Sequence, residues 1–557
     1  MTAQSTDGSA PEQVDVVIAG AGPVGLVLAI DLGRRGIRTL LVEKDPSTKA
    51  WPKMDRSNAR TMEIFRRLGL AEQVRALGYP GDASMDVLIV RSLTVEPLAV
   101  LKYPTVDQHR ELIARTHDGS EPLEPYQLVS QNDLEPLLSR TAQALPGVQV
   151  RFGSELVDFD QSEHGVRVRL RQVDGSEVEV DAGYLVGCDG GVSTVRKKLG
   201  IPLEGRGSIV ELAQVTFSSD ELYDRIPIGK GRHYYFADQP GSTIVVQGSR
   251  RQFTLNLRVP EGDVDLRAEI AKRIGSDIEF EIVNTRQWKM HLLLAQHYRD
   301  GRVFIAGDAV HLVIPTGGLG MNTGVGDAID LAWKLAGTVQ GWGGPGLLDS
   351  YEPERRAIGA RNVEAAGWAA EGMFMWQSLW RPEINDDTPE GAAVRADVAS
   401  AAAQHHRRVF DMVGIELGYS YAESSLVAYE PDNVASWDTI RYEPSARPGS
   451  RLPHVWLSDG RPVQDVLGQY YTFLDVTGSF DASTIAEAFE QLGAPLTVVS
   501  VDEPRAREVY GAGLVLLRPD MHVFWRGDQL PDPAALASAA TGFDVGQFGA
   551  PRAVSVA

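Results

Sequence analysis

Three glycines near the N-terminus have the spacing of a phosphate-binding loop. Gly20, Gly22 and Gly25 lie in VIAGAGPVGL, residues 17–26, and form a G-x-G-x-x-G motif. Glycines at these positions let the backbone approach a pyrophosphate, and the free N–H groups of the following helix stabilise its charge. Glu43 follows at the distance expected of the acid that binds ribose hydroxyls. The motif predicts dinucleotide binding and does not by itself distinguish FAD from NAD(P).

Two further motifs place acidic residues where apolar strands are expected to end. In YLVGCDGG, residues 184–191, an apolar run leads to Asp189, and in VFIAGD, residues 303–308, another leads to Asp308. A glycine-rich loop and GMN, residues 320–322, come after the second motif, where a helix is expected to begin. A carboxylate there can accept from a ribityl hydroxyl, and the free helix N–H groups favour an electron-rich ring. Taken alone, the segment around Asp189 is also explained by a strand-to-helix turn.

The three motifs together resemble the para-hydroxybenzoate hydroxylase family of FAD-dependent aromatic monooxygenases. Their order and spacing match that family over residues 14–363, including QNDLE at 131–135 and YEPERR at 351–356. The resemblance implies bound FAD, and NADPH or NADH as a transient electron donor. It implies that Gly22 and Glu43 bind the adenosine half of FAD, Asp308 the pyrophosphate and ribityl region, and Met321 and Asn322 the pyrimidine end. Gln131 would lie near the ribityl chain, and Lys53 would lie near the diphosphate in place of an arginine. The other implied cofactor-binding residues, within the motifs, are Gly20, Pro23, Gly25, Asp189 and Gly320.

Other segments resemble the phenol hydroxylase and chlorophenol monooxygenase branch of this family. DRSNARTME at 55–63 resembles the segment that closes the flavin site, FDMVGIELGYSY at 410–421 suggests the chlorophenol enzymes, and residues 445–557 resemble their thioredoxin-like domain. That last region contains no cysteine. It therefore cannot carry out dithiol chemistry, and we expect it to serve structure or a homodimer contact.

The resemblance also implies a reaction. FAD reduced by NAD(P)H would react with O2 to give a flavin C4a-hydroperoxide, which hydroxylates a phenolic compound, either a simple phenol or a polycyclic aromatic polyketide. An alternative outcome of the same chemistry is Baeyer–Villiger-type oxygen insertion or oxidative ring rearrangement of a polycyclic substrate. A third hypothesis is a flavin-binding protein without turnover, although none of the motifs is degraded.

Two residues are candidates for catalysis. Asp55 aligns with the general base of phenol hydroxylase. Its ordinary pKa of about 3.9 is about six units below that of a phenol, so it can help only if it is desolvated or if another group favours the phenolate. A surface or capping role is the alternative. Pro315 matches a family proline whose carbonyl contacts a substrate hydroxyl, and a turn-stabilising role explains it equally well.

Aromatic residues and histidines give weaker signals. His233 and Tyr235 alternate with Tyr234 along the predicted strand HYYFA, so one face of that strand either contacts substrate or packs in the core. We expect His311 to hold its loop rather than to act as a base. The spacing of the eleven histidines predicts no metal site.

The elements that must position these residues alternate between strands and helices. Residues 14–19 and 39–43 read as buried parallel strands, and Pro23 opens the helix between them. GWGGPG at 341–346 repeats the glycine spacing but follows a helical segment, and we expect a loop there. The predicted fold is α/β: a Rossmann-like FAD-binding domain (1–85, 125–205 and 283–375) interleaved with a β-sheet substrate domain (86–124 and 206–282), a helical connecting region (376–444), and a thioredoxin-like α/β domain (445–557).

Composition excludes several classes of function. The 557-residue chain has a net charge of −21 and no basic run, which argues against nucleic acid and anionic membranes as partners. No segment has the roughly 20 apolar residues of a membrane span, and MTAQSTDGSAPEQ does not resemble a secretory signal. Cys188 is the only cysteine, which excludes an intrachain disulfide and fits a cytoplasmic location.

Overall fold

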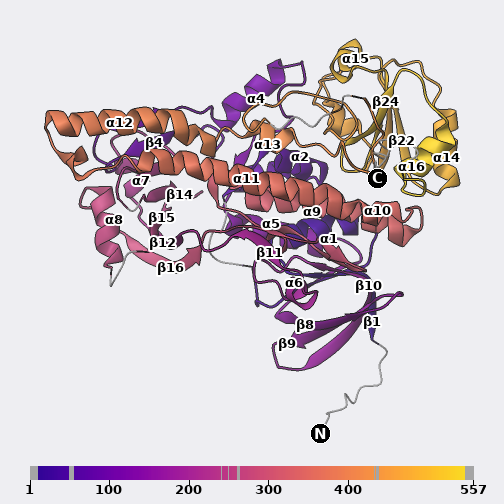
Figure 1. Ribbon diagram of the computed structural model, residues 1–557, viewed down its shortest axis with the longest axis horizontal. Helices are drawn as coiled ribbons and strands as arrows, with labels where there is room; N and C mark the ends of the chain where they lie inside the picture. The colour runs from indigo at the N-terminus through magenta and orange to yellow at the C-terminus, as the bar shows by residue number, and fades with distance from the viewer. Residues whose placement is uncertain are drawn as a thin grey trace, which may run out of the picture.

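The structure, a computed structural model, describes residues 11–48, 55–239, 241–248, 250–259, 264–431, 433, 438–545 and 548. In this part of the chain the strands form sheets of eight, seven, four, three and two strands. The long helix α11 (Tyr351–Gln377) runs from the seven-stranded sheet toward the C-terminal domain, which is drawn in yellow in Figure 1. None of the described helices is long and apolar enough to span a bilayer.

The eight-stranded sheet has the βαβ order that the first glycine motif predicts. Its strands β19, β10, β1, β2 and β7 lie side by side and pair in parallel. The apolar run of β1 is buried on both faces of the sheet, and α1 begins at Pro23, as predicted, and packs against α9. The elements are β1 (Glu12–Ala19), α1 (Pro23–Arg34), β2 (Thr39–Glu43), β7 (Val148–Phe152), β8 (Ser154–Gln161), β9 (Val166–Gln172), β10 (Glu177–Gly187), β18 (Arg299–Asp300), β19 (Val303–Ile305) and α9 (Leu319–Gln340).

The seven-stranded sheet has one apolar face and one mixed face. Successive side chains alternate between the two faces, so Tyr234 and Ile244 lie in a hydrophobic core while their neighbours lie on the opposite side. Helix α8 packs against the apolar face through Ile270 and Ile274. The elements are β4 (Val87–Val90), β5 (Ala99–Leu101), β12 (Glu211–Ser218), β13 (His233–Phe236), β14 (Thr243–Val246), β15 (Gln252–Arg258), α8 (Leu266–Ile274) and β16 (Glu281–Lys289).

Strand β16 corrects one of the expected domain boundaries. It pairs with β12 from Glu281 to Lys289, so it belongs to the seven-stranded sheet along its whole length. The boundary expected between residues 282 and 283 therefore cuts through a strand. The exposure of β16 alternates from residue to residue across the expected boundary, but its sequence, EIVNTRQWK, does not alternate apolar and polar residues and so gave no clear signal of the strand. The division of the rest of the chain into domains stays a prediction.

The C-terminal region is a compact α/β domain with a mixed four-stranded sheet. The order is β22-β21-β23-β24, in which β21 and β22 are parallel and the other pairs are antiparallel. This is the arrangement expected of a thioredoxin-like domain. Its elements are β21 (Tyr471–Asp475), α14 (Ser483–Gln491), β22 (Leu496–Ser500), α15 (Pro504–Tyr510), β23 (Leu514–Leu517), β24 (Val523–Gly527) and α16 (Pro533–Ala540).

The remaining elements connect these layers. Two short strands, β3 and β6, pair beside the cavity described below, and α12 and α13 belong to the helical connecting region. Their bounds are β3 (Arg56–Ser57), α2 (Ala59–Arg67), α3 (Ala71–Leu77), α4 (Val106–Arg115), β6 (Gln127–Leu128), α5 (Gln131–Gln143), α6 (Thr194–Lys198), β11 (Leu203–Arg206), α7 (Leu222–Arg225), β17 (Leu292–Ala295), β20 (His311–Leu312), α10 (Gly346–Asp349), α12 (Pro389–His405) and α13 (Val413–Leu417).

Buried ion pairs join the C-terminal region to the rest of the molecule. Glu63 on α2 accepts hydrogen bonds from Arg451 at 2.7 and 2.5 Å and from the N–H of Leu123 at 2.9 Å. Burial alone would raise the pKa of Glu63, but the charge of Arg451 and these hydrogen bonds outweigh it and lower the pKa to about 2. Glu63 is therefore ionised, and its charge is neutralised by a residue almost 400 positions away in the sequence.

A second buried cluster makes the same connection one layer deeper. Arg518 donates to Glu354 on α11 at 2.8 Å and to Asp330 on α9 at 3.0 Å. Lys334 donates to the same two carboxylates, to Asp330 at 2.8 Å and to Glu354 at 2.7 Å. All four side chains are fully buried. Because unpaired charges are costly inside a protein, these contacts hold α9, α11 and the C-terminal domain in one arrangement.

Replacing Glu63 with Gln should lower the free energy of unfolding by about 3–5 kcal/mol at pH 7, because Arg451 then stays buried without a counter-charge. The pKa of Glu63 lies below its ordinary value of 4.5, so its contribution is complete above that pH and is lost as the pH falls toward 2. The decline of the melting temperature between pH 5 and pH 3 should therefore be shallower in the variant than in the wild type.

The matched control is Glu72→Gln, because Glu72 pairs with Arg110 on the surface, where both side chains are exposed. We expect this change to cost less than about 1 kcal/mol. Equal effects of the two substitutions on the melting temperature would contradict the importance of the buried pair.

Candidate active site

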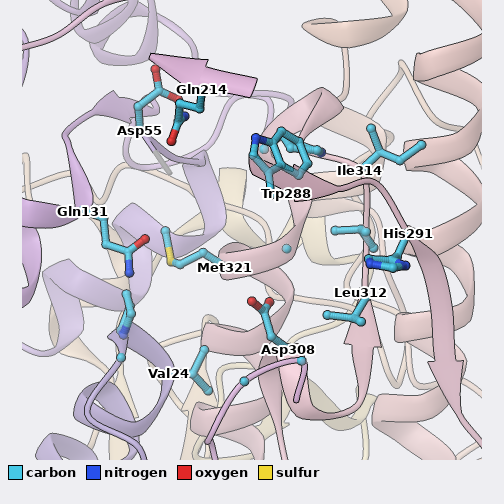
Figure 2. Close-up of a pocket in the computed structure, with 18 of the residues that line it drawn as sticks. Val24, Asp55, Gln131, Gln214, Trp288, His291, Asp308, Leu312, Ile314 and Met321 are labelled. Atoms are coloured by element: carbon cyan, nitrogen blue, oxygen red, sulfur yellow. The ribbon is translucent and has the colours of Figure 1, made fainter. Parts of the chain in front are cut away.

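One cavity of about 1050 Å³ runs from the first glycine motif to the mixed face of the seven-stranded sheet. Its volume is at the upper end of the range of about 300–1,000 Å³ that is common for one ligand, so it has room for a large cofactor and a second molecule. Figure 2 shows Val24 and Asp308 at one end of this cavity in that view, and Asp55, Gln214 and Trp288 at the other.

The glycine motif forms an open cradle at the first end. A Cβ at Gly22 would meet no atom within 4 Å, and Gly22 lines the cavity. A Cβ at Gly25 would lie 2.1 Å from the carbonyl oxygen of Gly20, so only glycine allows α1 to pack this closely. Helix α1 has no side-chain cap, which leaves its first N–H groups free for an anion. Pro23 occupies the first helical position, where its missing N–H costs nothing.

Two acidic residues lie beside this cradle. Glu43 at the end of β2 accepts from the N–H groups of Ala21 at 2.9 Å and Asp45 at 3.1 Å, which fixes its carboxylate against the glycine loop. Asp189 uses one oxygen to accept from the N–H groups of Thr194 and Val195 at the start of α6. Its other oxygen is buried and has no hydrogen-bond partner among the described residues, and Asp189 lines the cavity, so this atom is placed to accept from a bound molecule.

The start of α9 forms the opposite wall. Gly317 and Gly318 have φ values of 78° and 65°, in the left-handed region that favours glycine, and Gly318 is the N-cap without a side-chain cap. Gly320, Met321 and Asp308 line the cavity. The start of this helix thus presents free N–H groups toward the space where an electron-rich ring is expected. These features, with the unpartnered oxygen of Asp189, fit the phosphates and ring system of FAD.

Asn322 has a different role from its neighbours. Its side-chain amide donates to the carbonyl of Arg56 at 2.9 Å and accepts from the N–H of Asn58 at 2.9 Å. The side chain therefore holds the segment that carries Asp55 against the start of α9, and it is not part of the cavity wall. The implied contact of Asn322 with the flavin rests on its backbone alone.

A fully buried carboxylate supports the loop around Asp308. Asp327 accepts from the N–H of Gly307 at 3.0 Å, from Nε2 of His311 at 2.9 Å and from Nε of Arg355 at 2.8 Å. Burial alone would raise the pKa of Asp327, but the charge of Arg355 and these hydrogen bonds lower it. His311 is thus a structural residue that positions the loop, as the sequence analysis expects.

Asp55 lies at the sheet end of the cavity beside Arg232 and His233. Oδ2 of Asp55 is 3.1 Å from Nη2 of Arg232 and 3.7 Å from Nε2 of His233. Burial alone would raise the pKa of Asp55, but the charge of Arg232 outweighs it, so the pKa lies below its ordinary value. Burial also lowers the pKa of His233 to about 4, so this imidazole is neutral at pH 7. Asp55 is therefore a carboxylate with a fixed cation behind it.

The mixed face of the sheet forms the rest of this end. His233 and Tyr235 both line the cavity, whereas Tyr234 between them is in the core. Burial raises the pKa of Tyr235 above its ordinary value, so its hydroxyl stays protonated. The cavity face of the sheet consists of Leu212, Gln214, His233, Tyr235, Thr243, Val245, Gln247, Thr254, Asn256, Arg258, Arg286, Trp288 and Lys289.

Three other predicted residues have defined positions or fall outside the structure. Gln131 begins α5, lines the cavity and donates through Nε2 to Glu135 at 2.5 Å. Pro315 lines the cavity, and its carbonyl accepts from the N–H of Gly318 at 3.0 Å, which closes the turn before α9. Lys53 lies outside the described residues.

Arg232 and Asp327 are the residues that sequence reasoning missed. Arg232 is fully buried, and its Nε and Nη1 have no hydrogen-bond partner in the part of the chain that the structure describes. Its one local signal is that it directly precedes the aromatic strand β13. Asp327 shows a clearer signal, because it is one of three charged positions, with Asp330 and Lys334, in an otherwise apolar helix. Among the described residues no group of His, Cys, Asp or Glu has the arrangement of a metal site.

Comparison with known families covers most of the chain. Residues 13–366 match a family described as FAD binding domain, and residues 445–547 match one described as aromatic-ring hydroxylase, C-terminal. The FAD-dependent monooxygenase apdD of Emericella nidulans is 34% identical, over 96% of this chain and 91% of its own length. The 2,4-dichlorophenol 6-monooxygenase of Cupriavidus pinatubonensis is 31% identical, over 94% of each chain.

A solved structure has the same fold. The rebeccamycin biosynthetic enzyme RebC with reduced flavin superposes with a TM-score of 0.88 at 33% sequence identity, over 96% of this chain and all of the other. Because the match covers 96% of this chain, it extends over the eight-stranded sheet, the seven-stranded sheet and the C-terminal domain. The chain therefore belongs to the FAD-dependent aromatic-ring hydroxylases, a family of flavoprotein monooxygenases.

Proposed function

We propose that this monooxygenase uses NAD(P)H and O2 to hydroxylate a phenolic compound that is bound between the start of α9 and the mixed face of the seven-stranded sheet. One observation carries the proposal: a single cavity is lined both by the cradle that fits FAD and by the Asp55–Arg232 pair. A dichlorophenol monooxygenase among the relatives supports a phenol as the substrate class. Homodimer formation and a cytoplasmic location stay predictions.

FAD, when bound, supplies hydride acceptance and the activation of O2. The protein positions it through the free N–H groups of α1 and α9 and through Glu43, Asp189 and Asp308. Among the described residues, the first glycine motif is the only one that lies in a βαβ unit, and the proposal assigns it to FAD. We therefore propose that NAD(P)H binds transiently, and the choice between NADPH and NADH stays open.

Asp55 orients the substrate hydroxyl by accepting its hydrogen bond. Full proton transfer to a carboxylate whose pKa lies below 3.8 would be uphill by at least about six pKa units, or about 8 kcal/mol, for a phenol with a pKa of about 10. Asp55 is therefore a poor base for the resting phenol. As the ring is attacked, its hydroxyl becomes more acidic and the proton passes from the phenol oxygen to Asp55, and the buried cation Arg232 stabilises the negative charge on these oxygens until the transfer.

Apolar side chains keep water away from the reacting atoms. They surround the sheet end of the cavity and come from the strands, from the segment before α13 and from α11. This lining strengthens every charge interaction inside the cavity, because it lowers the local dielectric constant. The residues are Met85, Leu128, Leu212, Val245, Trp288, Met290, Phe374 and Phe410.

Replacing Gly22 with Leu should abolish FAD retention without unfolding the protein. The φ of Gly22 is −73°, which any residue adopts, and no atom of the described residues lies within 4 Å of a Cβ placed there, so the new side chain fills the cradle. The ratio of flavin to protein absorbance after gel filtration measures retention, and circular dichroism measures folding.

Gly207→Leu is the control for that experiment, because Gly207 is exposed and lies outside the cavity wall. We expect the control to keep its flavin. A Gly22→Leu variant that retains a full complement of FAD would contradict the assignment of the phosphate cradle.

Replacing Asp55 with Asn should lower the rate of product formation about 10- to 100-fold, because the amide orients the phenol poorly and Arg232 loses its counter-charge. Reduction of the flavin by NAD(P)H should change less than about twofold, since Asp55 is part of the substrate end. Stopped-flow absorbance separates the two half-reactions. An equal loss in both would remove Asp55 from substrate activation.

Ring opening or rearrangement is the competing outcome, and the ultraviolet spectrum of the product distinguishes it. A hydroxylated product keeps its aromatic absorption, whereas a product of oxygen insertion into a C–C bond of the reacting ring loses it.

A further inference from the structure

Three polar side chains form a continuous row across the mixed face of the seven-stranded sheet. Gln214 on β12 stands opposite Arg286 on β16 and opposite Asn256 on β15, so the three side chains lie in register on the cavity side. Nε of Arg286 donates to Oε1 of Gln214 at 2.5 Å, and Nε2 of Gln214 donates to Oδ1 of Asn256 at 3.3 Å. Figure 2 shows Gln214 pointing into the cavity near Asp55.

The direction of this chain of hydrogen bonds is fixed by chemistry. A guanidinium has donors and no acceptor, so the atom of Gln214 that faces Arg286 must be the oxygen. The amide nitrogen of Gln214 then faces Asn256, and the side-chain oxygen of Asn256 must accept its hydrogen bond. The amide nitrogen of Asn256 is left over, and no hydrogen bond from it is formed within the described part of the chain.

The charged side chains that this sheet contributes to the cavity are positive, so they also favour a ligand atom that accepts hydrogen bonds. The sheet brings Arg258, Arg286 and Lys289 to the cavity, and none of its described Asp or Glu residues lines that space. This is unusual in a chain whose net charge is −21. The positive charge of Arg286 also polarises the two amides in sequence, which makes the N–H groups of Asn256 stronger donors.

We propose that Asn256 is a specificity-determining residue that binds a second oxygen acceptor of the substrate, a carboxylate or a carbonyl separate from the hydroxyl oriented by Asp55. The inference rests on the proposed function, because it concerns the same cavity. The preferred substrate is thus an aromatic compound with a phenolic hydroxyl at one position and an acceptor oxygen at another. A site with a fixed donor discriminates strongly against a ligand that leaves it unpaired.

Binding to the oxidised holoenzyme without NAD(P)H tests the proposal, with the change in flavin absorbance and calorimetry as readouts. The probes share one ring system: 2-naphthol, 6-hydroxy-2-naphthoic acid, its methyl ester and 6-amino-2-naphthol. We expect the wild type to bind the acid or the ester at least about tenfold more tightly than 2-naphthol, since a hydrogen bond to a charged or polarised group contributes about that much. A preference for the acid over the ester assigns a carboxylate, and equal binding assigns a carbonyl.

Two variants replace the donor that residue 256 presents to the cavity with an acceptor, each in a different way. Asn256→Asp replaces the donor with an acceptor of the same shape and should weaken acid and ester binding at least about tenfold, while 2-naphthol changes little. Gln214→Glu can only accept from Arg286 and from Asn256, so the amide of Asn256 must turn and present its oxygen to the cavity. This second variant should favour 6-amino-2-naphthol, which carries a donor.

Asn284→Asp is the matched control, because it adds the same charge to β16 outside the cavity wall. Melting temperature and flavin content identify variants that fail to fold. The proposal is overturned if neither acceptor probe binds the wild type better than 2-naphthol, or if both variants leave the order of the four probes unchanged. Turnover of any phenol by the wild type, measured separately, tells whether the proposed function survives such a result.

Discussion

The buried carboxylate of Asp327 is the interaction on which the active site depends. It joins the loop of Gly307, the imidazole of His311 and the guanidinium of Arg355, which come from separate elements. Removing one partner of a buried ion pair costs about 3–5 kcal/mol because the other charge stays in the interior. Asp308 and the start of α9 are therefore held at a fixed separation before any ligand enters. Such preorganisation spares the protein from ordering these groups when it binds its cofactor.

The same two helices carry the charges that bind the C-terminal domain. Asp330 follows Asp327 by about one turn of α9, and Glu354 precedes Arg355 on α11, so the cluster around Arg518 begins where the cluster around Asp327 ends. The C-terminal domain is therefore continuous with the support of the flavin cradle and is not an attached module. The domain contains no cysteine, and it contributes to the active site by holding α9 and α11 through these ion pairs.

Local patterns predicted the order of strand, glycine loop, helix and strand around the first motif and the strands that lead to Asp189 and Asp308, because their signals lie within short segments. Glu12 to Glu43 form one βαβ unit, and His233, Tyr234 and Tyr235 alternate along their strand as predicted, with Tyr234 in the core and the other two at the cavity. The contact of His233 and Tyr235 with substrate stays a prediction. The environment of Asp55 was not predictable in this way. Arg232 is 177 residues away from Asp55 in the sequence and meets it only because β13 begins beside the segment before β3. Long-range ion pairs leave no periodic trace in a single sequence.

One face of the seven-stranded sheet packs in the hydrophobic core, and the other face lines the cavity. Successive side chains of β12, β13, β14 and β15 face the core and the cavity alternately. One residue is therefore constrained by core packing, and its neighbour in the sequence is constrained by the ligand in the cavity. Changes on the cavity face leave the apolar core intact, and substitutions away from a core are usually close to neutral for stability. Substrate preference can therefore drift through single mutations without the loss of folding that normally limits such change. In this respect the strand repeat itself makes the enzyme evolvable, and libraries built on these positions alone should yield a high fraction of folded variants.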